Sequence, residues 1–404
     1  MKTLPSGSNI LSTTIATLSG TDSSNTDSAA PFLIATTADR RLHILALPAL
    51  ALHASYSSLS DAPILSCTPY GKDTLLCTTM SGVLLAININ GKLLDKRKDH
   101  SKYVIACAVF DPARQASSAS TRQSQAPLIT TAGWDNKVHV YSSRTTSPSH
   151  FSIGAPISTL TLPTKPESLL FLSHPETGDP ILLLSRTDSS FLHYYALPPP
   201  TPTTSTHSTP GEPVLLGTQN LAPHSNAWVA FTPSSLALHP TDPTLIAVGT
   251  NTLPHMKLLI VRLLIPPLTP STTTTVPSAT QAHQARAALA IADREHAAIN
   301  LHVNTMAPQT AYSTPCVAWR ADGSGVWVNG DDGVVRGVEA KTGKVVVSLG
   351  GINGGDFGEW HEAGSKVRCL ATAEFDMGLE GREVLVSGGF DQRLVVWRAG
   401  EGAD

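Results

Sequence analysis

Two distant segments of this sequence align position for position without a gap, and this repetition constrains the fold more than any other feature. Residues 128–141 and 384–397 each comprise a β-branched strand, a tight turn containing Gly and Asp, and a second strand that ends in an aromatic residue. Weaker copies of the pattern occur at 32–45, 75–87, 181–194, 245–261 and 326–338. Such self-similarity is typical of repeat architectures, in which each unit buries its apolar face only against its neighbours.

Most of these units have a further short strand before them, and two have one after them. The preceding strands are at 104–110, 235–238, 316–319 and 367–370, and the following ones are within 90–94 and 341–347. The complete unit is therefore four antiparallel strands, and the units number about seven. Packing them around a ring buries every face and protects the sheet edges. The sequence thus predicts an all-β fold, a single β-propeller over residues 1–404.

The pattern is interrupted at several places. Residues 22–30 and 117–125 are polar, Ser-rich insertions that we expect within blades, and the Pro/Thr-rich stretch 198–213 is expected between blades. The largest interruption, residues 266–299, is predicted to lie between blade strands. Its first part, 266–278, is expected to be flexible, and the Ala-rich part, 280–298, is expected to form a short helix on the surface or, alternatively, a docking element for a partner.

Ring closure imposes a requirement on the last unit. Residues 398–404 are few and polar for an outer strand, so we expect the last blade to take its fourth strand from residues 1–11.

Net charge and cysteine content narrow the choice of cellular compartment and of partner class. The formal net charge of -3 over 404 residues gives no broad positive field for nucleic acid or an anionic membrane. The start of the chain lacks an apolar core of signal-peptide length, and no apolar run approaches the roughly 18–20 residues that a membrane span requires. We therefore expect an intracellular protein, cytoplasmic or nuclear. We interpret the five cysteines as isolated buried thiols: Cys67, Cys77, Cys107, Cys316 and Cys369.

The last unit resembles a repeat of the WD-repeat β-propeller family. Its Trp397 stands at the hallmark position, and His361, Ser387 and Asp391 match the family's buried hydrogen-bonded tetrad. A similar set occurs in the third unit, with Tyr in place of Trp: His100, Thr131, Asp135 and Tyr141. The resemblance implies that these residues are structural and that His361, Ser387 and Asp391 are not a catalytic triad.

The resemblance also implies a non-catalytic scaffold or adaptor that binds other proteins within a multi-protein complex, with no cofactor and no metal site. Two alternatives remain open. One is a propeller-fold hydrolase or lyase with acidic or His side chains gathered at one mouth of the central channel. The other is binding of phosphoinositide or nucleic acid through a basic blade edge, whose residues are Lys92, Lys96, Arg97, Lys98 and Lys102.

The partner face is predicted from the turns. In this strand order, the Asp-containing turns and the turns that enter each inner strand share one face of the disc, and exposed aromatic or Arg side chains there suit the centre of an interface. The candidate residues are Tyr103, Trp134, Trp360, Phe390, Arg40 and Arg41.

Overall fold

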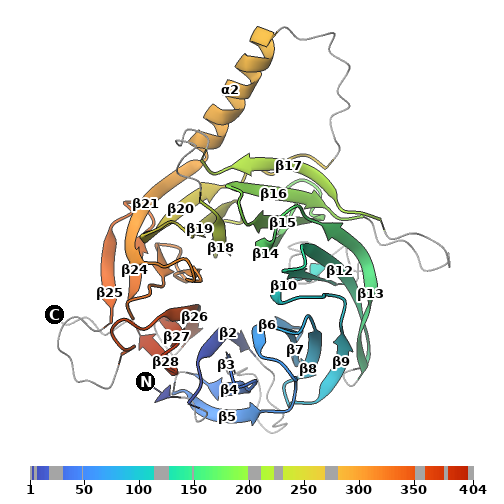
Figure 1. The fold of residues 1–404 in the computed structure, drawn as a ribbon, viewed down its shortest axis with the longest axis vertical. Helices are drawn as coiled ribbons and strands as arrows, with labels where there is room; N and C mark the ends of the chain where they lie inside the picture. The colour runs from blue at the N-terminus through green and yellow to red at the C-terminus, as the bar shows by residue number, and fades with distance from the viewer. Residues whose placement is uncertain are drawn as a thin grey trace.

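The computed structural model describes residues 2–3, 7–17, 31–47, 49–112, 127–147, 150–198, 211–222, 231–268, 281–350, 360–376 and 381–398. These residues form seven four-stranded antiparallel sheets arranged as blades around a central axis (Figure 1). The prediction of an all-β propeller with about seven blades is confirmed.

Each blade runs from an inner strand beside the central axis to an outer strand at the rim. In this order, blade 1 is β2 (Ile10–Thr17), β3 (Pro31–Thr37), β4 (Leu42–Ala46) and β5 (Ala51–Tyr56). Blade 2 is β6 (Ile64–Tyr70), β7 (Thr74–Thr79), β8 (Leu84–Asn88) and β9 (Leu93–Arg97). Blade 3 is β10 (Val104–Phe110), β11 (Leu128–Gly133), β12 (Lys137–Ser147) and β13 (His150–Thr161). Blade 4 is β14 (Pro166–Ser173), β15 (Pro180–Arg186), β16 (Phe191–Ala196) and β17 (Val214–Asn220).

The remaining blades complete the ring. Blade 5 is β18 (Pro233–Leu238), β19 (Leu245–Thr250), β20 (His255–Arg262) and β21 (Ile299–Pro308), with the helix α2 (Gln281–Ala297) inserted before β21. Blade 6 is β22 (Val317–Trp319), β23 (Gly325–Val328), β24 (Val335–Glu339) and β25 (Val345–Leu349). Blade 7 is β26 (Val367–Asp376), β27 (Gly381–Gly389), β28 (Arg393–Arg398) and β1 (Lys2–Thr3).

Blade 7 closes the ring with the N-terminal strand. Lys2 lies opposite Leu394 and Thr3 opposite Arg393 in an antiparallel pairing of β1 with β28. The predicted exchange of the outer strand is confirmed, and the contact joins the first and last parts of the chain in one sheet (Figure 1).

The apolar core lies between neighbouring blades. One cluster joins Leu76 of β7 to Ile129 and Tyr141 of blade 3, and another joins Val335 of β24 to Leu385 of β27. Each blade therefore buries its faces against the next, which explains why the repeat occurs as a set and not as one copy.

Tight turns connect the second and third strands of the blades. The residue after the turn Asp has a positive φ at Arg40, Asn136 and Gln392, and Gly82 and Gly333 take this conformation at the equivalent positions of blades 2 and 6. Because the strands alternate in direction, these turns and the connections into the inner strands lie on one face of the disc. We name this face, which includes residues 38–41, 134–136 and 390–392, the turn face.

The structure corrects two expectations about the interruptions. The strands on either side of the stretch 198–213, β16 and β17, belong to the same blade, so this stretch does not separate two blades. Pro266 lies against Gly217, and Leu268 packs on the apolar cluster between blades 4 and 5, so the start of the predicted flexible stretch is packed. Residues 269–278 lie outside the described residues, as do 22–30 and 117–125.

Helix α2 extends away from the ring (Figure 1), and almost all of its described side chains are exposed. It begins and ends within one residue of the predicted limits, Gln281–Ala297 against 280–298. Its last turn is held to the rim, where Glu295 is buried and accepts a hydrogen bond from the backbone N–H of Asn220 at 2.8 Å.

The interpretation of five isolated cysteines was wrong for one pair. Cys67 on β6 lies directly opposite Cys77 on β7, and their Sγ atoms are 2.8 Å apart, both as free thiols. The proximity arises from the β6–β7 register, which places residues ten apart in the sequence on opposite strands.

Candidate protein-binding face

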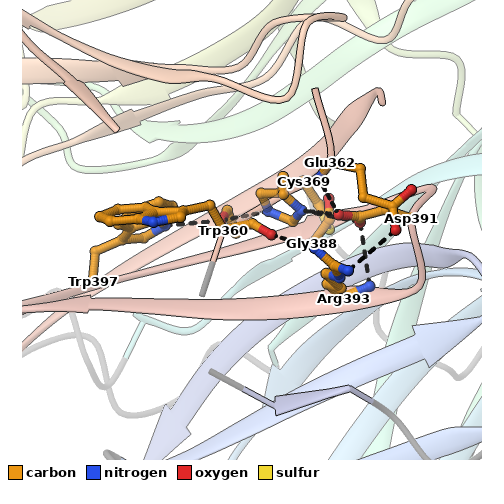
Figure 2. Close-up of polar contacts among 9 residues, drawn as sticks. Trp360, Glu362, Cys369, Gly388, Asp391, Arg393 and Trp397 are labelled. Atoms are coloured by element: carbon orange, nitrogen blue, oxygen red, sulfur yellow. Dashed lines mark hydrogen bonds and ion pairs between the residues drawn. The ribbon is translucent and has the colours of Figure 1, made fainter. Parts of the chain in front are cut away.

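The tetrad predicted in blade 7 is one hydrogen-bonded chain that runs from the core to the turn face (Figure 2). The indole Nε1–H of Trp397 donates to Ser387 Oγ at 2.9 Å, and this Oγ lies 2.8 Å from His361 Nε2. His361 Nδ1 lies 3.0 Å from the Asp391 carboxylate. The geometry is satisfied when Ser387 donates to Nε2 and the Nδ1–H of His361 donates to Asp391.

Backbone groups hold Asp391 in place. The N–H of Glu362 donates to its Oδ2 at 2.9 Å, and the N–H of Arg393 donates to its Oδ1 at 3.3 Å. Burial alone would raise the pKa of Asp391, but the bonds from His361 and these amides lower it below its ordinary value. Gly389 permits the approach, because a Cβ there would lie 2.5 Å from Asp391 Oδ1 and 2.8 Å from His361 Nδ1.

Blade 3 repeats this arrangement. His100 Nδ1 lies 2.9 Å from Asp135 Oδ1, and His100 Nε2 lies 2.9 Å from Thr131 Oγ1. The N–H of Ser101 donates to Asp135 Oδ2 at 3.0 Å, matching Glu362 in blade 7. Tyr141 is buried at the Trp397 position, and burial raises the pKa of its hydroxyl. The structure thus brings both predicted sets together.

Both sets are enclosed within their blades. The side chains of His361 and Asp391 are completely buried, and so is Ser387. A nucleophilic Ser must reach a substrate, and this hydroxyl is already engaged by Trp397 and His361. Among the described residues, no group of three or more His, Cys, Asp or Glu side chains is placed to hold a metal ion.

Three histidines that are scattered in the sequence occupy equivalent positions on the third strands. His43, His139 and His193 are each buried and lie opposite the residue that corresponds to Ser387 in their blades. Burial lowers the pKa of each of them. The Nδ1 atom of His139 lies 2.9 Å from Thr159 Oγ1 and forms a hydrogen bond with it, and the His139 ring packs edge-on against His100. Within the described part of the chain, the Nε2 atom of His139 has no hydrogen-bond partner.

This arrangement predicts a loss of stability in acid. Burial, followed by the nearby His100, lowers the pKa of His139 from 6.5 to about 4, so the unfolded chain binds this proton more readily. Stability contributed by neutral His139 is therefore complete above pH 6.5 and is lost as the pH falls toward 4. We expect the thermal midpoint of the His139→Gln variant to fall less between pH 7 and pH 5 than that of the parent. The control variant is His53→Gln, because His53 is exposed. If the thermal midpoint of His139→Gln depends on pH as that of the parent does, burial of neutral His139 is not the cause of the loss of stability in acid.

The candidate partner residues have unequal exposure. Tyr103 and Trp134 are 38% and 37% exposed and stack on each other, with ring centroids 5.3 Å apart. Lys165, from the connection into β14, places its Nζ 4.7 Å from the centroid of the Trp134 ring. Phe390 is 37% exposed in the matching turn of blade 7.

Of the other three candidates, Trp360 and Arg41 are already engaged within the protein, whereas Arg40 is exposed. Trp360 is half-buried and packs against Trp397, with ring centroids 4.9 Å apart, so it belongs mainly to the blade core. Arg41 pairs with Asp39 at 3.1 Å, and Arg40 is exposed with a positive φ at the turn tip.

Two further residues of the turn face were not predicted from the sequence. Tyr312, in the connection into β22, is 90% exposed, and Leu253, in the β19–β20 turn, is 53% exposed. Neither residue belongs to a motif. For Tyr312, the position of an aromatic residue in a short polar stretch before an inner strand could have indicated exposure on the turn face. Outside α2 and the outer strands, the exposed large apolar side chains of the described residues all lie at or beside the turn face: Tyr103, Trp134, Phe191, Leu253, Tyr312 and Phe390.

The basic segment lies on outer strand β9 and the loop that follows it. Lys92, Lys96 and Lys98 are exposed, and Asp95 and Asp99 flank the run from Lys96 to Lys98. Arg97 pairs with Asp99 at 3.0 Å, and Asp95 accepts the backbone N–H of Ile153 at 2.6 Å. The segment is therefore a mixed-charge edge.

Seven four-stranded blades, closed by a strand from the other end of the chain, define a β-propeller. A family model described as UCP007778, beta-propeller domain, matches residues 23–398, and the chain belongs to this family. A comparison with curated proteins gave no match. Within the described residues, no helix has both the length and the apolar character that crossing a membrane requires.

Proposed function

We propose that this protein is a non-catalytic scaffold of the WD-repeat type, acting inside the cell as a subunit of a multi-protein complex and binding a partner protein through the turn face. The supporting observation is the gathering of exposed aromatic side chains on this face. Aromatic residues bury much apolar area at low entropic cost, and they dominate the energetics of protein interfaces. Trp134 and Phe390 stand on turns stiffened by the two buried tetrads, so their positions are fixed before binding.

The central axis supports binding over hydrolysis. Six inner strands carry a register shift directly after their first residue, and the bulged residues occupy equivalent places around the axis near the turn face. These residues are Leu11, Leu65, Ile105, Glu167, Ser234 and Arg368. One acidic residue in this ring does not provide the paired acid and base that glycoside-type hydrolysis uses.

The proposal is tested at Tyr312. Proteins that co-purify with the parent are quantified by mass spectrometry and compared with those retained by Tyr312→Ala. We expect a defined set to drop several-fold, because a 90% exposed ring contributes to an interface and not to the core. Val214→Ala, on outer strand β17, is the matched exposed control. If both variants retain the co-purifying proteins equally, the turn face is not the binding site. If retention of these proteins falls steeply with salt concentration, the basic segment is favoured.

A further inference from the structure

Blade 2 contains two cysteines that face each other across neighbouring strands. Cys67 on the inner strand β6 is the register partner of Cys77 on β7, and their Sγ atoms lie 2.8 Å apart as free thiols. Among the described residues, which include all five cysteines, no other two sulfur atoms are in hydrogen-bonding contact. A disulfide bond is about 2.03–2.05 Å long, so the two sulfurs need to approach by less than about 1 Å to bond.

The backbone of this strand pair suits such a bond. Pro69 has no N–H, so it fits the β6 ladder where its nitrogen points away from β7, in a pair without backbone hydrogen bonds. Its register partner is Leu75, and the pairing continues without a bulge to Cys67 and Cys77, two residues along. Because the two kinds of pair alternate, the cysteines also form a pair without backbone hydrogen bonds. The Cα atoms of such pairs are about 4.5 Å apart, within the range of about 4.4–6.8 Å that disulfides span.

The surroundings enclose the two thiols. Both belong to the apolar cluster between blades 1 and 2, which also contains Ile34 and Ile44 of blade 1. Cys77 is fully buried, and Cys67 is 5% exposed. Burial raises the pKa of the Cys77 thiol well above its ordinary value, so this thiol is protonated at neutral pH. An oxidant must therefore be small to enter the folded blade, and Cys67 is the residue that it reaches first.

We propose that Cys67 and Cys77 are a modification site, at which hydrogen peroxide converts the two thiols to a cross-strand disulfide. Cys67 loses its proton, and its sulfur attacks one peroxide oxygen to give a sulfenic acid, while the other oxygen leaves as hydroxide and takes up that proton to form water. The sulfur of Cys77 then displaces the second oxygen, which leaves as water with the Cys77 proton, and the S–S bond forms. The two thiols together lose two electrons and two protons, and the peroxide is reduced to two water molecules.

The disulfide would tie the inner strand of blade 2 to the strand beside it. It closes a loop from residue 67 to residue 77, and a cross-link of this kind stabilises the fold by reducing the conformational freedom of the unfolded chain. In a reducing compartment the free thiols are the resting state, and a disulfide there is transient and responds to oxidant. The site is separate from the turn face and does not depend on the function proposed for it.

The test uses the full-length protein, which is first reduced and then treated with hydrogen peroxide while folded. Free thiols are blocked with iodoacetamide in denaturant, and the protein is digested with trypsin without reduction. Lys72 lies between the two cysteines, so trypsin separates them into the peptides 42–72 and 73–92. We expect mass spectrometry to find these peptides joined by a disulfide after peroxide treatment, and separate and alkylated before it.

Variants assign the bond to this pair. Cys67→Ala and Cys77→Ala should each abolish the joined product. Cys369→Ala removes a buried thiol from the inner strand of blade 7, so it is the matched control and should retain the product. Peroxide should also raise the thermal midpoint by a few degrees in the parent and in the control, but not in the other two variants.

The exposed Met306 provides an internal measure of contact with the oxidant, because peroxide converts methionine to its sulfoxide. If Met306 is oxidised while Cys67 and Cys77 are still alkylated separately, the proposal is overturned. Sulfinic acid at either cysteine in place of the link would also overturn it, because the second thiol then fails to reach the oxidised sulfur. A linked dimer on a non-reducing gel would replace the cross-strand bond with one between two copies of the chain.

Discussion

Replacing Asp391 with alanine is expected to lower the free energy of unfolding by about 1–3 kcal/mol, because the change leaves the Nδ1–H of the buried His361 without its acceptor and also removes the acceptor of the Glu362 amide. The other hydrogen bonds of the tetrad are weakened as well, because His361 is then free to rotate away from Ser387, which accepts the bond from Trp397. Thermal melts of parent and variant at pH 7 provide the measurement.

The pH dependence gives the prediction a second check. The pKa of Asp391 is lowered in the folded state, so its stabilisation is present above the carboxyl pKa of the unfolded chain and is lost as the pH falls through the folded value. The stability difference between parent and Asp391→Ala should therefore shrink in acid. Asp322→Ala, whose side chain is 55% exposed, is the control and should change stability little. An Asp391→Ala midpoint equal to that of the parent would show that the tetrad contributes nothing to the fold.

The repeat pattern was sufficient to predict the ring because each blade is a local unit. The strand–turn–strand hairpins at 128–141 and 384–397 are contiguous in the sequence, and their Gly and Asp residues identify the turns directly. Ring closure through β1 was predicted because residues 398–404 are few and polar for an outer strand. The same reasoning failed at 198–213, where Pro and Thr content suggested a blade boundary although β17 of the same blade follows.

What could not be predicted depends on register and exposure. The contact between Cys67 and Cys77 requires the β6–β7 pairing, which includes a bulge between Ile64 and Ser66, and no sequence motif reports it. Of the candidate partner residues, Trp134 and Phe390 were predicted from their position next to the turn Asp, and both are exposed. Tyr312 was not found, because its exposure is set by the loop that carries it.

The half-burial of Trp360 illustrates the same limit. It flanks His361 in the sequence as Tyr103 lies close to His100, yet only Tyr103 remains exposed. Trp360 packs against the indole of Trp397 on the third strand of blade 7. Tyr141 occupies the Trp397 position in blade 3, and Tyr103 instead stacks on Trp134 at the surface. The two aromatic residues are not at equivalent positions of the repeat, because Trp360 precedes His361 by one residue whereas Tyr103 follows His100 by three.

The double variant Trp134→Ala with Phe390→Ala is expected to weaken binding of the main partner by about 2 kcal/mol or more, which is roughly thirtyfold in Kd. Both side chains are more than one third exposed, so their removal costs the isolated protein little core packing. Trp134 also loses its contacts with Tyr103 and Lys165, which are surface contacts of modest energy. The thermal midpoint should accordingly fall far less than the affinity. The measurement is the Kd of the purified partner by surface plasmon resonance, with melts of the same samples.

The control for this variant removes similar apolar area elsewhere. Leu52→Ala with Leu93→Ala takes two side chains that are 41% and 44% exposed from the outer strands of blades 1 and 2. A general effect of exposed apolar surface would weaken binding equally in both double variants, whereas a site on the turn face is affected by the first alone. If the partner binds the parent and both double variants with the same Kd, the turn face is not its site. The basic segment from Lys92 to Lys102 is then the next surface to test. Because its lysines are exposed, binding there would weaken as the salt concentration rises.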